Sequence, residues 1–180
     1  EGDVLAGKYR VERVLGHGGM GVVIVATHVH FNDTVAIKFL LPEIAQNADI
    51  VQRFLREGRS ARRIKSEHVV KVSDIDVLPS GAPYMVMEYL EGTDLAQVLE
   101  AQGTLRIEDA VEYVLQACDA LVEAHALGIV HRDLKPANLF LTRRPGMATL
   151  VKVLDFGIAK VASSDGGRSA LTATGGMMGS

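Results

Sequence analysis

The chain has 180 residues, of which 48% are hydrophobic and 23% are charged, and its formal net charge is −3. This composition is that of a globular protein with an apolar core and excludes a disordered chain. The weak negative charge gives no electrostatic reason to expect nucleic acid or an acidic membrane surface as a partner. The length allows one or two domains.

The single cysteine, Cys118, excludes an internal disulfide and suits a reducing compartment, so we expect a cytoplasmic domain. Because Cys118 falls in an apolar helical stretch, it is expected to pack in the core. No run of about 18 apolar residues and no signal peptide occur, so we expect no membrane contact within the chain. The first residue is not methionine and the chain ends in a Gly/Met-rich stretch, so we expect it to be cut from a longer protein, which could be membrane-anchored elsewhere.

Three strand patterns open the chain. Residues 9–15 alternate in type, and residues 22–27 and 35–40 are rich in β-branched side chains. Glycines separate the first two patterns, and the turn residues 31–34 separate the second from the third. The spacing predicts an antiparallel β-meander.

The glycines between the first two strands, Gly16, Gly18 and Gly21, fit G-x-G-x-x-G. A dinucleotide-binding turn of this spacing must open a helix, whereas Gly21 leads into a predicted strand. No Gly-Lys-Ser/Thr follows, so a P-loop is excluded as well. Two interpretations remain: a plain flexible hairpin, or a loop whose glycines permit positive φ and let backbone N–H groups approach phosphates.

A helix is predicted over residues 49–64, with apolar residues at helical spacing at Ile50, Phe54, Ala61 and Ile64. Glu57 falls on the same stripe, where a carboxylate is unfavourable unless it meets a cation. It lies either at the edge of the stripe in water or in an ion pair with Lys38, which ends the run Val-Ala-Ile-Lys. Gly58 weakens the helix by about 1 kcal/mol relative to Ala and predicts mobility.

The rest of this helix is crowded with arginines, namely Arg53, Arg56, Arg59, Arg62 and Arg63. They form either a solvated charged face or a docking surface for a phosphorylated segment or a second copy of the chain. Two further strands are predicted over residues 69–78 and 84–87, joined by a Pro/Gly turn. The connector 88–94 then leads from strands to helices.

Helices are predicted over residues 94–101 and 107–126. The buried face of the second is expected to hold Ile107, Ala110, Val111, Val114, Leu115, Cys118, Leu121 and Val122. Residues 139–141 and 150–154 follow as a hairpin. Residues 163–180 are rich in Ser, Thr, Gly and Asp and are predicted to be a loop.

Between the long helix and the hairpin lies His-Arg-Asp-Leu-Lys-Pro-Ala-Asn-Leu-Phe at residues 131–140, and Asp-Phe-Gly follows at 155–157. These two motifs resemble the catalytic loop and metal-binding turn of the protein kinase family. The glycine loop, with Val23 two residues after its last glycine, is similar to the kinase loop that covers ATP phosphates. The resemblance implies an α+β, two-lobed fold with a five-stranded antiparallel N-lobe sheet, one main N-lobe helix and a truncated, mainly helical C-lobe.

This resemblance also implies boundaries and cofactors. The N-lobe would span residues 1–87, the hinge 88–94 and the partial C-lobe 95–180. ATP and Mg²⁺ would be the cofactors, and the catalytic and metal-binding residues would be Lys38, Glu57, Asp133, Lys135, Asn138 and Asp155. Lys38 would hold the α- and β-phosphates, braced by Glu57, while Asp133 accepts or orients the substrate proton. Lys135 would lie by the γ-phosphate, and the other two would bind the metal.

For the nucleotide, the resemblance implies contacts from Leu15, Gly16, Gly18, Gly21, Val23, Ala36, Lys38, Met87, Glu88, Leu90, Asp94 and Phe140. Val23, Ala36 and Phe140 would sandwich the adenine. The Glu88 carbonyl and Leu90 N–H would bond its edge, because backbone groups present fixed geometry. Met87 would be the gatekeeper, and Asp94 would reach the ribose. His131 and Phe156 are expected to pack between the lobes.

Leu-Lys-Pro-Ala between Asp133 and Asn138 looks like the Ser/Thr-kinase form, and the chain from Tyr9 onward is most similar to bacterial-type Ser/Thr kinases. The expected partners are ATP and proteins with Ser/Thr hydroxyls, with a kinase homodimer as a further expectation for the complete protein. The chain departs from the family because no Ala-Pro-Glu-type motif follows, so the substrate-binding floor is absent and we expect poor or no activity. We also expect an uncovered apolar patch on helix 107–126 and aggregation in solution.

Two hypotheses that assign the chain to other functional classes stay open. A pseudokinase scaffold would lose Lys38, Asp133 or Asp155, all of which are present. A nucleotide-binding module would bind ATP without transferring phosphate. Control is expected at Thr172 or Thr174, where the family carries activating phosphosites, with the phosphate docking on Arg132 because arginine binds phosphate bidentately.

Overall fold

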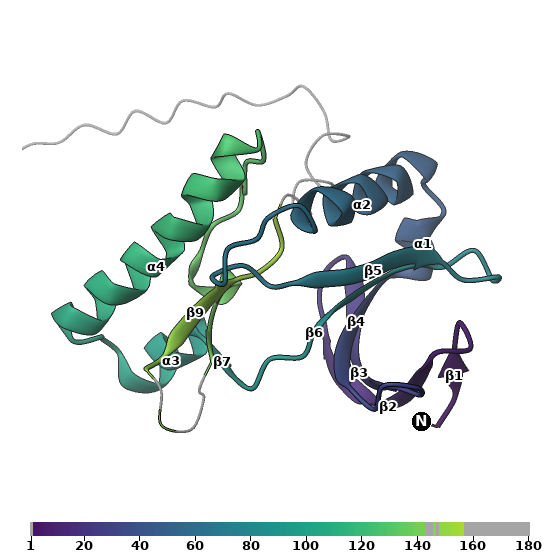
Figure 1. Cartoon of the computed structure of the whole chain (residues 1–180), viewed down its shortest axis with the longest axis horizontal. Coiled ribbons are helices and arrows are strands. Elements are labelled where there is room, and N and C mark those ends of the chain that lie inside the picture. Colours follow the sequence, from purple (N-terminus) through teal and green to yellow (C-terminus); the bar gives the residue numbers. More distant parts are fainter. Residues whose placement is uncertain (1, 143–145, 147, 157–180) are drawn as a thin grey trace, which may run out of the picture.

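The computed structural model describes residues 2–142, 146 and 148–156, and its elements form two groups that lie beside each other (Figure 1). One is a curved antiparallel sheet with helices α1 (Pro42–Ala45) and α2 (Ala48–Ala61). The other combines a small sheet with helices α3 (Leu95–Gln102) and α4 (Ile107–Ala126). The α+β class expected from the sequence is confirmed. Gly157, Thr172 and Thr174 lie outside the described residues.

The larger sheet has six strands in the order β1-β2-β3-β4-β6-β5. Their bounds are Val4–Leu5 (β1), Tyr9–His17 (β2), Gly21–His28 (β3), Thr34–Leu40 (β4), Val72–Val77 (β5) and Pro83–Glu88 (β6). The sequence predicted five of these. The two-residue strand β1, which pairs with Arg10 and Tyr9, is too short to show an alternating pattern.

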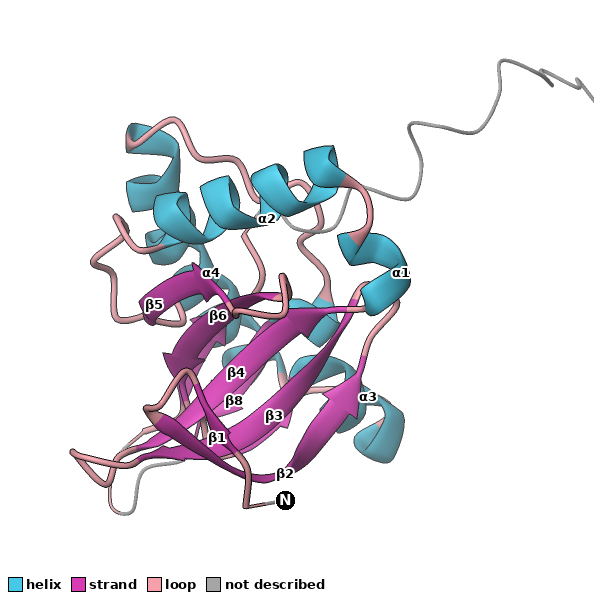
Figure 2. Ribbon diagram, turned by 90° about the vertical axis from the view of Figure 1, so that its right-hand side faces the viewer, coloured by secondary structure: helices cyan, strands magenta, loops and turns pink. Residues whose placement is uncertain are grey.

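The two faces of this sheet bury different clusters. One face packs Tyr9, Ile24, Ile37 and Val86 together with their neighbours. The other face is covered by α2, which lies across it (Figure 2), and holds Phe54, Ala61, Leu40, Val72 and Met85. The predicted apolar stripe is confirmed for Ile50, Phe54 and Ala61, but the helix ends at Ala61 rather than at residue 64, and Ile64 packs in the core of the second group. The helix begins at Ala48 because the Asn47 side chain accepts hydrogen bonds from the backbone N–H groups of Asp49 and Ile50.

Gly58 lets α2 approach the sheet closely. A Cβ atom at this position would lie 2.3 Å from Cδ1 of Ile75 and 2.6 Å from Cε of Met85. A larger residue at position 58 would therefore require the side chains of Ile75 and Met85 to shift. The glycine thus serves packing, and the expectation that it makes the helix mobile has no support in this contact.

The second group holds strands β7 (Gly92–Asp94), β8 (Leu139–Thr142) and β9 (Leu150–Val153), hydrogen-bonded in that order. A 3₁₀ turn, η1 (Pro136–Asn138), leads into β8. The buried cluster of this group joins the small side chains Ala117, Ala120 and Ala124 of α4 to Val151 and Val153 of β9. Alanines let the helix approach the strand closely.

Helix α4 has the predicted bounds, but the buried face predicted for it is wrong. Most of the residues assigned to that face are exposed: Ile107, Val111, Val114, Leu115, Cys118 and Val122. The helix is apolar on two sides, and the side with the alanines packs on β9. Cys118 is therefore not a core residue. The exposed apolar face agrees with the uncovered patch expected for this helix.

Although α4 has 20 residues, no helix in the described part of the chain is long and apolar enough to cross a lipid bilayer.

Candidate active site

The loop after α4 is fixed by a buried histidine. His131 is 2% exposed, its Nε2 lies 2.7 Å from the Leu154 carbonyl oxygen, and its Nδ1 accepts the backbone N–H of Asp133 at 3.3 Å. This pattern assigns the proton to Nε2. The imidazole also contacts the ring of Phe156, with 4.9 Å between centroids. His131 and Phe156 thus pack together as expected, and the loop is held against the segment that carries Asp155.

Three polar side chains of this loop interact with one another. Asp133 Oδ2 lies 2.8 Å from Lys135 Nζ. Asn138 Nδ2 donates to the Asp133 carbonyl oxygen at 2.7 Å, and the turn η1 brings these two residues together. The hydrogen bond from Lys135 is the main cause that lowers the pKa of the Asp133 carboxyl. Asp133 is therefore ionised at neutral pH and can only accept hydrogen bonds.

A second ion pair faces this loop from the larger sheet. Lys38 lies on β4, opposite Val23 of β3 and Met85 of β6, and its Nζ is 2.7 Å from Asp155 Oδ1. The side chains are 12% and 34% exposed, so the carboxylate remains open to solvent on one side. Asp155 has φ of 54°, a left-handed conformation that a non-glycine residue adopts at a cost.

These two ion pairs line one cleft of about 430 Å³. It is lined by Gly18, Gly19, Met20, Gly21, Val23, Lys38, Asp133, Lys135, Asn138 and Asp155. The lining thus comes from the β2–β3 turn, β3, β4, the loop after α4 and the segment after β9. Residues far apart in the sequence converge here with both charge signs, as in a small-molecule site.

The glycines of the β2–β3 turn act differently from the expectation. None of Gly16, Gly18 and Gly21 has a positive φ. Gly18 N–H donates to the Gly21 carbonyl at 2.8 Å, which closes the turn. A Cβ atom on Gly21 would lie 2.0 Å from the Phe39 carbonyl oxygen. Gly21 is therefore required for the close approach of β3 to β4, a steric rather than a conformational reason.

The predicted ion pair between Lys38 and Glu57 is not formed. Asp155 takes the Lys38 ammonium at 2.7 Å, and no ion pair of Glu57 is found among the described residues. Burial raises the pKa of Glu57 to about 7, against the opposing charges of Arg53, Arg56, Arg132 and Lys38. Glu57 instead borders a small space behind the cleft, next to Met87 and Phe156.

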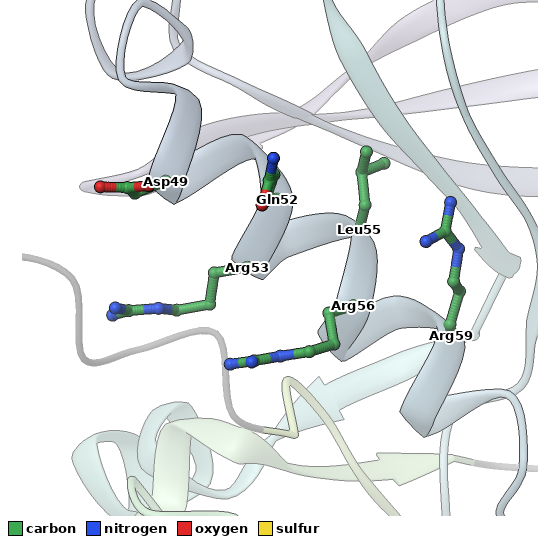
Figure 3. Close-up of a pocket in the computed structure, with 6 residues that line it drawn as sticks. All are labelled: Asp49, Gln52, Arg53, Leu55, Arg56 and Arg59. Atoms are coloured by element: carbon green, nitrogen blue, oxygen red, sulfur yellow. The ribbon is translucent and has the colours of Figure 1, made fainter.

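Basic side chains on α2 line a surface hollow together with Asp49, Gln52 and Leu55. Figure 3 shows the Arg53 and Arg56 side chains extending from the helix to the same side, whereas Arg59 points elsewhere. Since both of these arginines and Arg132 act on the pKa of Glu57, positive charge from α2 and from the catalytic loop gathers in one region.

Of the predicted adenine contacts, Val23 lines this cleft, whereas the others are not among its lining residues, namely Ala36, Met87, Glu88, Leu90 and Phe140. Ala36 and Met87 lie opposite each other on β4 and β6, and Leu15 is 44% exposed on β2. Leu90 is half-buried in the connector after β6. Phe140 lies on β8, opposite Asp94 and Lys152.

Two of the predicted nucleotide contacts already have structural partners. The Asp94 carboxylate caps α3 by accepting the backbone N–H of Gln97 at 3.0 Å, so a ribose would have to share it. The side chain of Glu88 forms an ion pair with Lys152 at 2.7 Å. The sequence analysis did not predict this ion pair. The signal that could have indicated it is the lysine inside the apolar run Leu-Val-Lys-Val-Leu that contains β9.

Glu123 is a second residue that the sequence did not reveal. Its carboxylate accepts the backbone N–H groups of Lys65 at 2.7 Å and Ser66 at 2.6 Å, which ties the turn after α2 to α4. A glutamate within an amphipathic helix carries no signal for such a contact.

The residues of the cleft fit a magnesium ion. Asn138 donates through Nδ2 to Asp133, which leaves its amide oxygen as the ligating atom, and Asp155 binds Lys38 through Oδ1 only. These are hard oxygen ligands, and Mg²⁺ takes few of them from protein when waters and phosphate oxygens complete its shell. No cluster of three or more His, Cys, Asp or Glu side chains for a metal occurs in the described ranges.

The fold and this site define a protein kinase. The protein kinase domain family matches residues 9–178, so the chain belongs to it. Its relatives are bacterial Ser/Thr kinases. Serine/threonine-protein kinase Pkn1 of Myxococcus xanthus is 48% identical over 162 residues, which is 89% of this chain and 23% of Pkn1. Serine/threonine-protein kinase PknB of Mycobacterium tuberculosis is 36% identical over 172 residues, which is 94% of this chain and 27% of PknB.

The same relationship appears in three dimensions. The PknI kinase domain of M. tuberculosis superimposes with a TM-score of 0.77 at 33% identity, covering 88% of this chain and 61% of that one. The chain thus spans about a quarter of the two curated relatives. The predicted family is confirmed.

Proposed function

We propose that this protein is a serine/threonine protein kinase that transfers the γ-phosphate of ATP to Ser/Thr hydroxyls with Mg²⁺. The observation that carries the proposal is the convergence of Lys38, Asp133, Asn138 and Asp155 on one cleft. Phosphoryl transfer needs charge neutralisation on the phosphates and an oriented nucleophile, and these side chains supply both. A pseudokinase lacking transfer is not favoured, because each of these groups is present.

The residues divide the chemistry between them. Asp133, ionised and acceptor-only, accepts or orients the proton of the attacking hydroxyl. Lys135 lies 2.8 Å from it and places positive charge beside the transferred phosphoryl group. Lys38 holds the α- and β-phosphates. Bound Mg²⁺ supplies charge neutralisation to the phosphates, and Asn138 and Asp155 would hold it.

We further propose the adenine contacts expected from the family. The Glu88 carbonyl and Leu90 N–H would bond the base edge, with Met87 as gatekeeper. Val23 and Ala36 support this because Val23 of β3 lies directly opposite Lys38 and Ala36 is two residues before Lys38 on β4, which puts all three side chains on one face of the sheet. Phe140 on β8 would close the opposite side of the base, and Leu15, Gly16 and Asp94 would complete the site.

The test is transfer of radiolabelled γ-phosphate to a generic protein acceptor, with phosphoamino-acid analysis. It uses a chain extended to the length of a complete kinase domain. We expect label on serine or threonine from the wild type and none from a folded Lys38→Met variant, with Arg63→Met as the control on the exposed surface. Equal labelling by Lys38→Met, or label on tyrosine alone, would refute the proposal.

Activity is proposed to depend on phosphorylation of Thr172 or Thr174, with the phosphate bound by Arg132 and an arginine of α2. The support is the positive charge that Arg53, Arg56 and Arg132 place around Glu57. Arginine captures phosphate with two parallel hydrogen bonds. Phosphopeptide mapping of the active protein, beside a Thr172→Ala/Thr174→Ala double variant, tests this. A double variant as fast as wild type would overturn it.

We propose that the 180-residue chain alone is poorly active, that the kinase domain is cytoplasmic and that the complete protein forms a kinase homodimer. The support is the exposed face of α4, which carries Val114, Leu115 and Val122 at 58%, 56% and 69% exposure. Size-exclusion chromatography and a transfer assay on the chain test this. A monomer that melts cooperatively and phosphorylates an acceptor would contradict it.

A further inference from the structure

A lysine of β9 is buried although the proposed reaction does not use it. Lys152 is 2% exposed, and its Nζ lies 2.7 Å from Glu88 Oε1 and 3.4 Å from the Val69 carbonyl oxygen. A buried ammonium group must be paired, because removing it from water costs several kcal/mol. Glu88 supplies that charge and is itself only 26% exposed.

The ion pair joins three segments of the chain. Glu88 Oε1 also accepts the backbone N–H of Lys71 at 2.8 Å, and the Glu88 N–H donates to the Lys71 carbonyl at 3.0 Å. Backbone hydrogen bonds in turn dock this stretch on β9: the Val70 N–H donates to the Val153 carbonyl at 3.1 Å. The end of β6, the stretch before β5, and β9 therefore meet at one carboxylate.

The two ends of the pair lie close to opposite ends of the proposed nucleotide site. Glu88 is the residue whose own carbonyl would bond the adenine edge, so its side chain fixes the orientation of that peptide. Lys152 is three residues before Asp155, the proposed metal ligand, and the strand between them is bonded to the same stretch. A buried ion pair often adds little stability over an apolar pair of the same volume. The position of this pair instead indicates that it holds the connector after β6 and strand β9 at a fixed distance from each other.

We propose that Lys152 and Glu88 are positioning residues that set the spacing between the adenine contacts and the Asp155 carboxylate, so that one nucleotide can reach both. This inference rests on the proposed kinase function. Loss of either charge leaves the backbone elements in place but releases the connector after β6 from β9. The consequence is weaker nucleotide binding by a protein that is still folded.

The experiment measures by calorimetry the Kd for ATP with Mg²⁺ of the protein extended to a complete kinase domain, and it records the melting temperature of each variant. The variants are Glu88→Gln, Lys152→Met and their combination. Glu88→Gln keeps an oxygen for the Lys71 N–H and removes only the charge. Lys65→Met, a loss of an exposed lysine in the turn after α2, is the matched control.

We expect each single variant to raise the Kd by roughly tenfold, about 1.4 kcal/mol. The Kd of the double variant should not exceed that of the single variant that binds ATP more weakly. Lys65→Met should bind like wild type. Single variants that bind as tightly as wild type, even with a lower melting temperature, would show a purely structural pair and overturn the inference. If Lys152→Met does not fold, Glu88→Gln decides alone. A wild type that binds no ATP refutes the proposed function instead.

Discussion

The two walls of the cleft differ in how their charged side chains are held. On the wall after α4, Asp133, Lys135 and Asn138 are within six residues and bond to one another and to their own backbone. On the opposite wall, Lys38 of β4 pairs with Asp155, whereas Glu57 of α2 borders the small space behind this wall. Local hydrogen bonds fix the first wall, whereas packing of a helix on a sheet fixes the second.

The difference predicts unequal effects of substitution. Removal of a group on the first wall disrupts a closed network, and removal of Glu57 takes away a carboxylate that has no ion pair with Lys38. Transfer assays below refer to a chain extended to a complete kinase domain.

The largest effect is expected for Asp133→Asn. The amide cannot accept the hydroxyl proton, so kcat should fall by roughly 100- to 10,000-fold while the protein stays folded. Steady-state kinetics with circular dichroism measures both. Asp119→Asn, a substitution of an exposed aspartate on α4, is the control. Turnover near the wild-type value would show that Asp133 has no part in proton transfer.

A smaller effect is expected for Lys135→Ala. Its hydrogen bond is the main cause of the low pKa of Asp133, so removal raises that pKa toward its ordinary value. The acid limb of the pH profile of kcat/KM should move to higher pH, with a lower plateau. A profile that keeps its acid limb while the plateau falls would mean that Lys135 acts on phosphate alone.

Glu57→Gln should be milder than either change. Because Glu57 does not pair with Lys38, we expect a few-fold change in KM for ATP and little in kcat. A loss as large as that of Lys38→Met would show that the second wall depends on this carboxylate and would break the comparison.

The smallest effect concerns pH and stability. The pKa of Glu57 rises on folding from 4.5 to about 7, so the folded chain binds more protons than the unfolded chain in that interval. Stability from this group is fully present below pH 4.5 and is lost as pH rises through about 7. Urea titrations across this interval should show a weaker decline for Glu57→Gln. Parallel curves for the two proteins would contradict the burial of Glu57.

The sequence was sufficient for the first wall and for most elements. Dense motifs such as Asp133 to Asn138 specify a turn and its contacts within a few residues, so pattern and geometry coincide. The bounds of α4 followed from its apolar period together with the glycine that follows it. Its buried face did not, because apolar residues occupy two sides and only the size of Ala117 and Ala120 identifies the one that packs on β9.

Contacts between distant elements could not be predicted in the same way. Glu57 was expected to form an ion pair with Lys38. How closely α2 approaches the sheet, however, depends on the contact of Gly58 with the side chains of Ile75 and Met85. The Lys152–Glu88 pair joins residues 64 positions apart, and only the buried setting of β9 reveals it. Such pairs depend on the tertiary packing of strands and helices, which local periodicity does not encode.

The central claim is that Asp155 and Asn138 bind Mg²⁺ at the phosphate end of the cleft. It is tested most directly by the Kd for ATP of the protein extended to a complete kinase domain, measured with Mg²⁺ and with EDTA, in the wild type and in Asp155→Asn. We predict that Mg²⁺ tightens binding to the wild type by roughly tenfold or more and leaves Asp155→Asn unchanged. The same Mg²⁺ dependence in both proteins, or none in the wild type, would contradict the claim.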